Sequence, residues 1–483
     1  MVTRRASSQL PKTKKASNTS ELELDDGIVT DSDEEFAGEL PQPCEHVSSD
    51  DDTPSAMDGD TTYIPPIPAG EALGEDDPVE QDLNTAFETW NPDLGLQADE
   101  ELAADTSAYL FLHQLTTPWP SYSVSFLPDK FGMRTTLPTS VTVIAGTQAP
   151  KGKSSSLFLL KCQNIHSTTF DGDEDREQDI PEDDEFEGEA QLTSVEIPHN
   201  GGVNKLLPLS SQGSIVATTS EDQSVYVYQI AGHLDYLNNP VGPPPVCQPI
   251  YTSTKQKDEG FALEWCNAGS SLSLLSGCCK GFVYQHVVTG NGIVAGRVIK
   301  AHNKSSVESI SVNPVNQSIL ATSSCDGSVK LWDLSSQSCT STIKVSKSDI
   351  NVCSILNDGF SLVTGDDDGG LSLYDLRNTS SPLTRNNWIK RPITSISRTP
   401  SLGYPNWEQG AVVTADDGSV TVWDFSIESE DANETVPCHL LFNHVCNGQA
   451  KDAAWHPQVP GALVCTSEEG LSIFKPRYLF DEE

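Results

Sequence analysis

A short phrase recurs along the chain from residue 222 onward. Each copy places an acidic residue in a turn, usually followed by glycine, and then a β-rich strand that often ends in Trp-Asp or Tyr-Asp. Six copies have anchors at spacings of 58, 46, 42, 49 and 52 residues, and these anchors are Asp222, Lys280, Asp326, Asp368, Asp417 and Glu469. Repeats of roughly 40–50 residues with this signature are typical of propeller blades that have four strands each. The pattern therefore predicts an all-β propeller.

A seventh blade is predicted upstream of these copies. The stretches VTVIAGTQA at 141–149 and SSLFLLKC at 155–162 have the composition of paired strands, and LTSVEIPH at 192–199 that of an outer strand. With this blade the ring has seven blades. We expect the last strand to pair with the first blade, because ring closure removes exposed sheet edges.

Three segments are expected along the chain. Residues 1–62 are predicted to be a disordered tail, basic and then acidic, residues 63–118 an N-terminal segment, and residues 119–477 the propeller. Within the middle segment, apolar residues at i, i+3, i+4 and i+7 predict a short docking helix at about 106–115. Its apolar stripe is formed by Ala108, Phe111, Leu112 and Leu115.

Acidic residues are concentrated outside the repeats. The formal net charge is −41, with 70 acidic and 29 basic residues, and residues 21–105 hold 27 acidic residues and no Lys or Arg. Residues 171–191 hold 12 more against Arg176 alone, among them Asp171, Asp173, Glu174, Asp175, Glu182, Asp183, Asp184 and Glu185. Such runs stay solvated, repel nucleic acids and membrane surfaces, and attract basic proteins at long range. The alternative interpretation is a tail that only increases solubility.

The remaining composition indicates an intracellular, reducing environment. Twelve cysteines are scattered without C-x-x-C spacing, which favours free thiols in the cytosol or nucleus. No signal peptide and no apolar run of about 18 residues is seen, so we expect neither secretion nor a membrane span. A basic stretch near the start predicts a nuclear import signal formed by Arg4, Arg5, Lys12, Lys14 and Lys15.

The sequence offers little support for catalysis. His302, Asp326 and a hydroxyl of ATSSC at 321–325 resemble a hydrolytic triad, but in a blade these groups and Trp332 are expected to hydrogen bond to one another between strands. The histidines show no recognised metal spacing, and no phosphate loop or nucleophile elbow is present. We therefore expect no enzyme activity, no cofactor and no metal site.

Several longer stretches resemble the glutamate-rich WD-repeat proteins, the ribosome-assembly branch of the family that includes the retinoblastoma-binding histone-binding propellers. The resemblance covers about residues 62 to 476. The matching stretches are TYIP at 62–65, SAYLFLHQL at 107–115, WPS at 119–121, AGTQA at 145–149, PHNGGVN at 198–204, GFALEW at 260–265, SVESISVNP at 306–314, GDDDGGLSLYDLR at 365–377, HLLFNH at 439–444 and HPQVPGALVCTSEEGLSIF at 456–474. AGTQA followed by an acidic loop and PHNGGVN is the most specific of these combinations.

The resemblance implies an acidic nuclear and nucleolar chaperone of large-subunit ribosome assembly. Its implied partners are a basic ribosomal protein, the third of the large subunit, together with pre-ribosome assembly factors and histones; direct nucleic-acid binding is not expected. Relatives hold a basic histone helix between the N-terminal helix and an acidic loop of blade six. Here that groove would use the predicted helix with Glu428, Glu430, Asp431, Glu434, Leu441 and Phe442. The alternative for Leu441 and Phe442 is that they are ordinary strand core.

A second functional hypothesis is a scaffold or substrate receptor of a cullin-type ubiquitin ligase. LSLYDLR at 371–377, with Asp375 and Arg377, resembles the WD-x-R box of such receptors. This box overlaps the ordinary repeat sequence, so the sequence alone leaves both hypotheses open.

Overall fold

The computed structural model describes most of the chain from residue 105 onward. It covers residues 105–168, 190–210, 212–268, 271–401, 403–404, 406–428, 436–477 and 479. It also gives the backbone of two paired strands, β1 (Val2–Ala6) and β2 (Glu100–Ala104). Of the tail predicted at 1–62, residues 2–6 form β1, which differs from the expected disorder, and the remaining residues lie outside the described residues.

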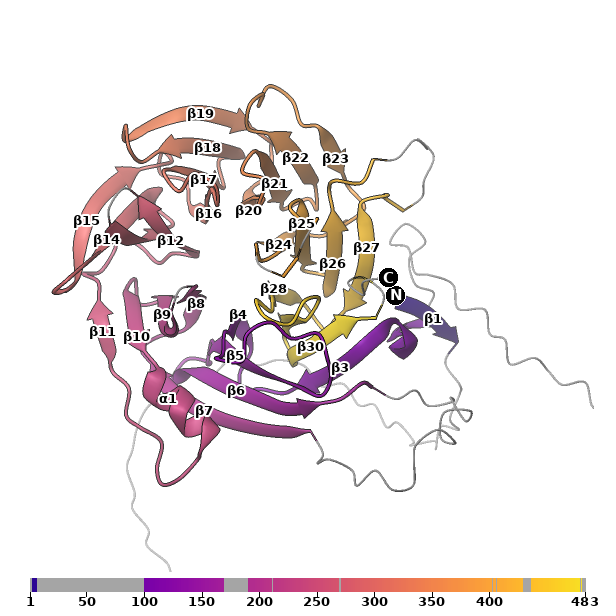
Figure 1. Cartoon of the computed structure of the whole chain (residues 1–483). Coiled ribbons are helices and arrows are strands. Elements are labelled where there is room, and N and C mark those ends of the chain that lie inside the picture. The colour runs from indigo at the N-terminus through magenta and orange to yellow at the C-terminus, as the bar shows by residue number, and fades with distance from the viewer. Residues whose placement is uncertain are drawn as a thin grey trace, which may run out of the picture. The chain divides into compact units, whose positions relative to one another are not determined.

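Seven antiparallel four-stranded sheets are arranged as the blades of a ring (Figure 1). Blade one comprises β4 (Ser121–Leu127), β5 (Thr139–Thr147), β6 (Ser155–Ile165) and β7 (Gln191–His199). Blade two comprises β8 (Val203–Leu209), β9 (Gln212–Ser220), β10 (Val225–Gln229) and β11 (Pro249–Thr252). Blade three comprises β12 (Ala262–Ala268), β13 (Ser271–Gly277), β14 (Phe282–Thr289) and β15 (Gly292–Lys300). Blade four comprises β16 (Val307–Val312), β17 (Ile319–Ser324), β18 (Ser328–Asp333) and β19 (Ser338–Lys344). Blade five comprises β20 (Ile350–Ile355), β21 (Ser361–Asp366), β22 (Leu371–Asp375) and β23 (Thr384–Asn386). Blade six comprises β24 (Ile393–Arg398), β25 (Gly410–Ala415), β26 (Ser419–Asp424) and β27 (Leu440–Val445). The seven-bladed propeller expected from the repeat spacing is confirmed.

Blade seven joins distant parts of the chain. Its strands are β28 (Ala450–Trp455), β29 (Leu463–Ser467) and β30 (Gly470–Pro476), and its outer strand is β3 (Tyr109–Leu115), which pairs with β30 in antiparallel register. The predicted helix at 106–115 is therefore wrong: only a 3-10 turn at Thr106–Ala108 precedes the strand. The expected pairing of the last strand with the first blade is also wrong: the last strand, β30, pairs with β3, and this upstream strand completes blade seven and closes the ring.

The physical reason for this error lies in a β-bulge. The pairing of β3 with β30 shifts register between Tyr109 and Phe111. Because a bulge inserts one extra residue, side chains on its two sides no longer follow strict alternation. Phe111 packs with the core between blades seven and one, whereas Tyr109 and Leu112 pack with the core between blades six and seven. The spacing that suggested a helical stripe thus arises from a strand that contributes to two cores.

The repeat anchors occupy equivalent places. All six fall in the turn between the second and third strands of their blades. At one of them, the side chain of Asp326 accepts a hydrogen bond from the backbone N–H of Ser328 (3.0 Å), and Gly327 has φ +72. A Cβ at Gly327 would lie 2.5 Å from the carbonyl oxygen of Ser346, so only glycine fits this turn.

The apolar cores lie between neighbouring blades. Each of seven buried clusters among the described residues draws side chains from two adjacent sheets. A short helix, α1 (Ala231–Asn238), follows β10 and packs with Leu237 on the core of blades one and two. Among the described residues no helix has the length and apolar character needed to cross a bilayer.

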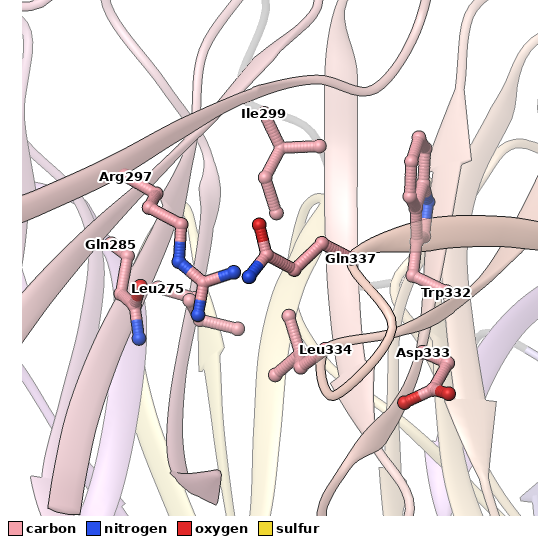
Figure 2. A pocket seen from close by; sticks show the side chains of 8 residues that line it. All are labelled: Leu275, Gln285, Arg297, Ile299, Trp332, Asp333, Leu334 and Gln337. Carbon is pink, nitrogen blue, oxygen red and sulfur yellow. The ribbon is translucent and has the colours of Figure 1, made fainter.

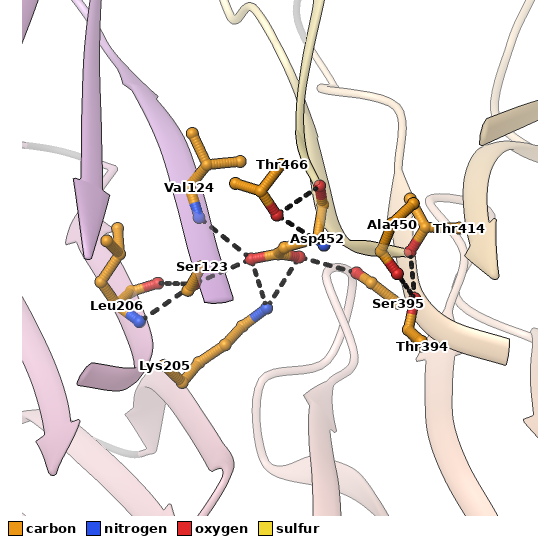
Figure 3. Close-up of polar contacts among 10 residues, drawn as sticks. All are labelled: Ser123, Val124, Lys205, Leu206, Thr394, Ser395, Thr414, Ala450, Asp452 and Thr466. Carbon is orange, nitrogen blue, oxygen red and sulfur yellow. Dashed lines mark hydrogen bonds and ion pairs between the residues drawn. The ribbon is translucent and has the colours of Figure 1, made fainter. Parts of the chain in front are cut away.

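The inner strands are joined by a buried polar network around Asp452 of β28 (Figure 3). Its carboxylate accepts hydrogen bonds from Lys205 Nζ of blade two (2.9 and 3.0 Å), from Ser123 Oγ of blade one (2.8 Å) and from Ser395 Oγ of blade six (2.8 Å). One carboxylate therefore connects four of the seven blades.

Candidate protein-binding site

Three acidic segments of the sequence are attached to the same face of the ring. In each blade the third and fourth strands are antiparallel neighbours, so the connection between them always leaves the ring on one face. The run at 171–191 connects β6 to β7 in blade one, and the run that begins at Glu428 connects β26 to β27 in blade six. The acidic stretch that ends at Asp105 enters β3, the fourth strand of blade seven, from this same face.

These three attachment points lie on consecutive blades. Blade seven stands between blades six and one, and its β3 contacts both neighbours. The backbone N–H of Thr168, the last described residue before the acidic run of blade one, donates to the carbonyl of Leu110 (3.0 Å). Thr168 Oγ1 accepts from the backbone N–H of Leu112 (3.0 Å). The blade-one loop thus starts in direct contact with the closing strand, a link that the sequence did not reveal.

The outer strands of blades six and seven meet through an aromatic cluster, which we call the closing seam. The ring of Tyr109 lies edge-on to Phe442 with centroids 5.3 Å apart, and its hydroxyl is 2.8 Å from Nδ1 of His444. His444 stacks on Phe474 at 4.4 Å. Burial raises the pKa of Tyr109, so its hydroxyl stays protonated. The seam fixes the strands that would flank a bound protein.

The predicted client-binding residues separate into buried and accessible ones. Phe111 is completely buried and Phe442 is 7% exposed, so both are core residues. The predicted contact of Phe111 with a client is not compatible with this burial. Ala108, Leu112, Leu115 and Leu441 are half-buried, and Glu428 is exposed at the end of blade six. For Phe442 the alternative interpretation, strand core, is the one that the structure favours.

The other predicted residues lie mostly beyond the described part of the chain. Glu430, Asp431 and Glu434 lie outside the described residues, and so do all eight named residues of the blade-one acidic loop. Of the predicted import signal, Arg4 and Arg5 belong to β1, where their backbones pair with Leu102 and Glu101 of β2. Lys12, Lys14 and Lys15 lie outside the described residues.

The group that resembles a hydrolytic triad is part of a blade, as expected. Nδ1 of His302 is 2.9 Å from Asp326 Oδ2, its Nε2 is 2.9 Å from Thr322 Oγ1, and Trp332 Nε1 donates to the same Thr322 hydroxyl (3.0 Å). His302 is fully buried, and burial lowers its pKa. Both of its ring nitrogens and the threonine hydroxyl are engaged in this network, so none of these groups is free to attack a substrate.

A cavity between blades three and four is too small for a ligand (Figure 2). Its volume is about 10 Å³, room for a single water molecule. Arg297 and Gln337 point toward each other across it, with Trp332 at one side. This cavity gives no support to a small-molecule site.

Two protein-family models match parts of the propeller sequence. A family model for the histone-binding protein RBBP4 and its counterpart in the CAF1 complex matches residues 99–166, which include β3 and end where the blade-one loop begins. A second model, Nucleolar protein 10-like, N-terminal domain, matches residues 293–448.

Three curated proteins are similar over longer stretches. Ribosome assembly protein rrb1 of Schizosaccharomyces pombe is 27% identical over 429 residues, 83% of this chain and 87% of that protein. Protein HEAT STRESS TOLERANT DWD 1 of Arabidopsis thaliana is 30% identical over 432 residues, 80% of this chain and 91% of that protein. Glutamate-rich WD repeat-containing protein 1 of Dictyostelium discoideum is 30% identical over 260 residues, 52% and 54% of the two chains.

Seven four-stranded blades, with Trp-Asp or Tyr-Asp at the end of the third strand in blades four, five and six, define a WD-repeat propeller, a class that presents surfaces to other proteins. The extent of the similarity narrows this class. The chain belongs to the glutamate-rich WD-repeat family that contains the ribosome-assembly proteins.

Proposed function

We propose that this protein is an acidic chaperone of large-subunit ribosome assembly in the nucleus and nucleolus. It holds a basic ribosomal protein, the third of the large subunit, and also accepts histones. The relative named as a ribosome assembly protein and the match to a histone-binding family model support this assignment. The protein acts by binding rather than by catalysis.

The observation that carries the proposal is that three acidic runs are attached to one face of blades six, seven and one. The 27 acidic residues of 21–105 and the 12 of 171–191 make up more than half of the chain's 70. Negative charge joined to the ring at these points attracts Lys/Arg-rich proteins and speeds their encounter with it. The half-buried Leu112 and Leu441 then offer apolar contacts on the outer strands of blades seven and six, and Leu115 lies at the far end of β3.

The two parts of the site have different roles. The acidic segments screen the client's basic surface from nucleic acids, with an affinity that falls as salt rises. The half-buried Leu112 and Leu441 beside the closing seam hold one element of the client and thereby select it. Ribosomal RNA, itself a dense polyanion, displaces the acidic segments when the client joins the pre-ribosome.

The test compares the full chain with a variant in which residues 171–191 are replaced by a Gly/Ser segment of equal length. Exposed ion pairs contribute about 0.2–1 kcal/mol each, so losing only a few contacts weakens binding on the order of tenfold. We expect weaker binding of the purified ribosomal protein and a shallower dependence on salt. A matched control replaces the neutral loop at 239–248 in the same way. Unchanged affinity and salt dependence in the first variant would contradict the electrostatic mechanism.

Leu112→Ser tests the half-buried apolar contact separately from the charge. We expect weaker binding at high salt, where apolar contacts remain, and little change in the salt dependence itself. Core histones and the ribosomal protein are measured in parallel, because a loss for only one of them identifies the client that uses this surface. If Leu112→Ser binds both clients with wild-type affinity, the proposed apolar contact between Leu112 and the client is contradicted.

A ubiquitin-ligase substrate receptor is the second candidate function. One observation favours it: Arg377 is 68% exposed in its side chain and is held by Asp375 through Nη2–Oδ2 (2.7 Å) and Nε–Oδ1 (2.9 Å) contacts. Its guanidinium also lies 4.2 Å from the ring centroid of Phe360. Affinity purification distinguishes the two functions. A ligase adaptor that is recovered with the wild type and lost on Arg377→Ala supports the second candidate, whereas ribosomal proteins and assembly factors support the first.

A further inference from the structure

A buried cluster of metal-ligating side chains lies at the closing seam. His444 belongs to β27 of blade six, Cys446 follows directly after that strand, and Cys465 belongs to β29 of blade seven. One ligand atom from each residue lies within 4.8 Å of the others, and the two sulfur atoms are 3.3 Å apart. The three side chains are 0%, 6% and 0% exposed.

The imidazole of His444 is held as a metal-ligating histidine is held. Its Nδ1 is 2.8 Å from the hydroxyl of Tyr109, which can accept the Nδ1 proton and fix the tautomer. Its Nε2 is buried and has no hydrogen-bond partner in the described part of the chain. Metal-bound histidines typically donate their other ring N–H to a partner of this kind. An unpartnered buried nitrogen beside two thiols is costly unless something binds it.

The charges of the cluster suit a divalent cation. Two thiolates and a neutral imidazole form a neutral complex with a divalent ion, which suits a site without solvent. In a tetrahedral site with bonds of about 2.0–2.3 Å, ligand atoms are separated by roughly 3.3–3.8 Å. Here the two sulfur atoms are 3.3 Å apart, and all three ligand atoms lie within 4.8 Å of one another.

We propose that His444, Cys446 and Cys465 bind one thiophilic cation, Zn²⁺ or Cu⁺, which ties the outer strand of blade six to blade seven. His444 would bind through Nε2, and the two thiols would each release a proton to solvent when they bind the metal. Ser472 lies opposite Cys465 in the pairing of β29 with β30 and interacts with its thiol. Because the cluster is buried, the metal would enter as the ring folds.

A disulfide between Cys446 and Cys465 is the alternative use of the same sulfur atoms. It would leave Nε2 of His444 unpartnered. The metal accounts for all three side chains and for the hydroxyl that contacts the imidazole, so we favour it.

The experiment uses the full chain purified under reducing conditions from cultures supplemented with zinc or with copper. We expect about one metal ion per chain in the wild type, identified by elemental mass spectrometry, and loss of that ion in Cys446→Ser and Cys465→Ser. Cys353→Ser is the matched control, because Cys353 is also buried but lies in β20 of blade five. The control should keep the metal.

A second measurement covers the case in which the serine variants fail to fold. Wild-type chain refolded with Co²⁺ should show the visible absorption of tetrahedral thiolate-bound cobalt, and chelator should lower its thermal midpoint. The proposal is overturned if folded wild type holds neither zinc nor copper and gives no cobalt spectrum. It is also overturned if alkylation mapping finds Cys446 and Cys465 disulfide-bonded, or if both serine variants fold and retain the metal.

Discussion

Replacing Asp452 with alanine should destabilise the propeller by about 3–5 kcal/mol, the usual loss when one partner of a buried ion pair is removed. Asp452 is 3% exposed and accepts hydrogen bonds from Lys205, Ser123 and Ser395 in three other blades. Its removal leaves the ammonium of Lys205 and the backbone N–H of Val124 without this acceptor. The side chain of Lys205 is 31% exposed, so water partly solvates its ammonium after this change. Lys205→Ala instead leaves the buried carboxylate of Asp452 without its cation, so it should also cost about 3–5 kcal/mol even though the hydrogen bonds from Ser123 and Ser395 remain.

Equilibrium unfolding in urea, followed by circular dichroism, measures these differences. Asp416→Ala is the control, because Asp416 forms a peripheral pair with Lys451 at 2.9 Å and such pairs contribute about 0–1 kcal/mol. Combining Asp452→Ala with Lys205→Met should recover part of the loss, since the unpaired charge is then removed as well. If Asp452→Ala unfolds within about 1 kcal/mol of the wild type, the view that this carboxylate joins four blades is refuted.

Three further changes test other parts of the structure. Phe111→Ala should lower the free energy of unfolding by about 3–5 kcal/mol because Phe111 is fully buried. Leu112→Ala should lower it clearly less because Leu112 is only half-buried. Equal losses in urea would contradict the conclusion that β3 buries Phe111 more deeply than Leu112. Burial lowers the pKa of His286 from 6.5 to about 4, so the unfolded chain takes up the proton first and stability falls as pH drops from about 6.5 to about 4. His286→Gln should reduce this loss of stability between pH 6.5 and pH 4 by up to about 3 kcal/mol. If the variant and the wild type lose the same stability across that pH range, the role of His286 is refuted. Tyr109→Phe removes the hydroxyl that contacts His444 and should cost about 1 kcal/mol in the same assay; no loss would mean that this contact is not stabilising.

The ring was predictable because its signal is repeated and local. Each anchor such as Asp326 sits in a turn whose chemistry is decided by the next few residues, and glycine is required where φ is positive. Six such turns, 42 to 58 residues apart, mark six blades even where one copy, at Lys280, has lost its acidic residue, and the strand-like stretches at 141–162 and 192–199 add the seventh. The acidic loop of blade one was also placed correctly between the third and fourth strands.

The closing strand was not predictable in the same way. Residues 109–115 have no partner nearby in sequence, and their pairing with β30 joins positions more than 350 residues apart. Local spacing alone could not distinguish a helical stripe from a bulged strand between two cores, because tertiary contacts override local preference. The same limit applies to Asp452 with Lys205, which become neighbours only when the ring is complete. It also applies to His444 with Cys465, which meet only when blades six and seven pack against each other. The pair Tyr-x-Phe at 109 and 111, typical of a strand, was the available signal.

The pairing of β3 with β30 has a consequence for biosynthesis. The ribosome makes β3 before any blade and its partner after all of them. The early strand must therefore wait, exposed, until nearly the whole chain has emerged, which is the situation in which aggregation competes with folding. Shortening the chain by its final strand would not give a slightly smaller ring but an open arc with two unsatisfied edges.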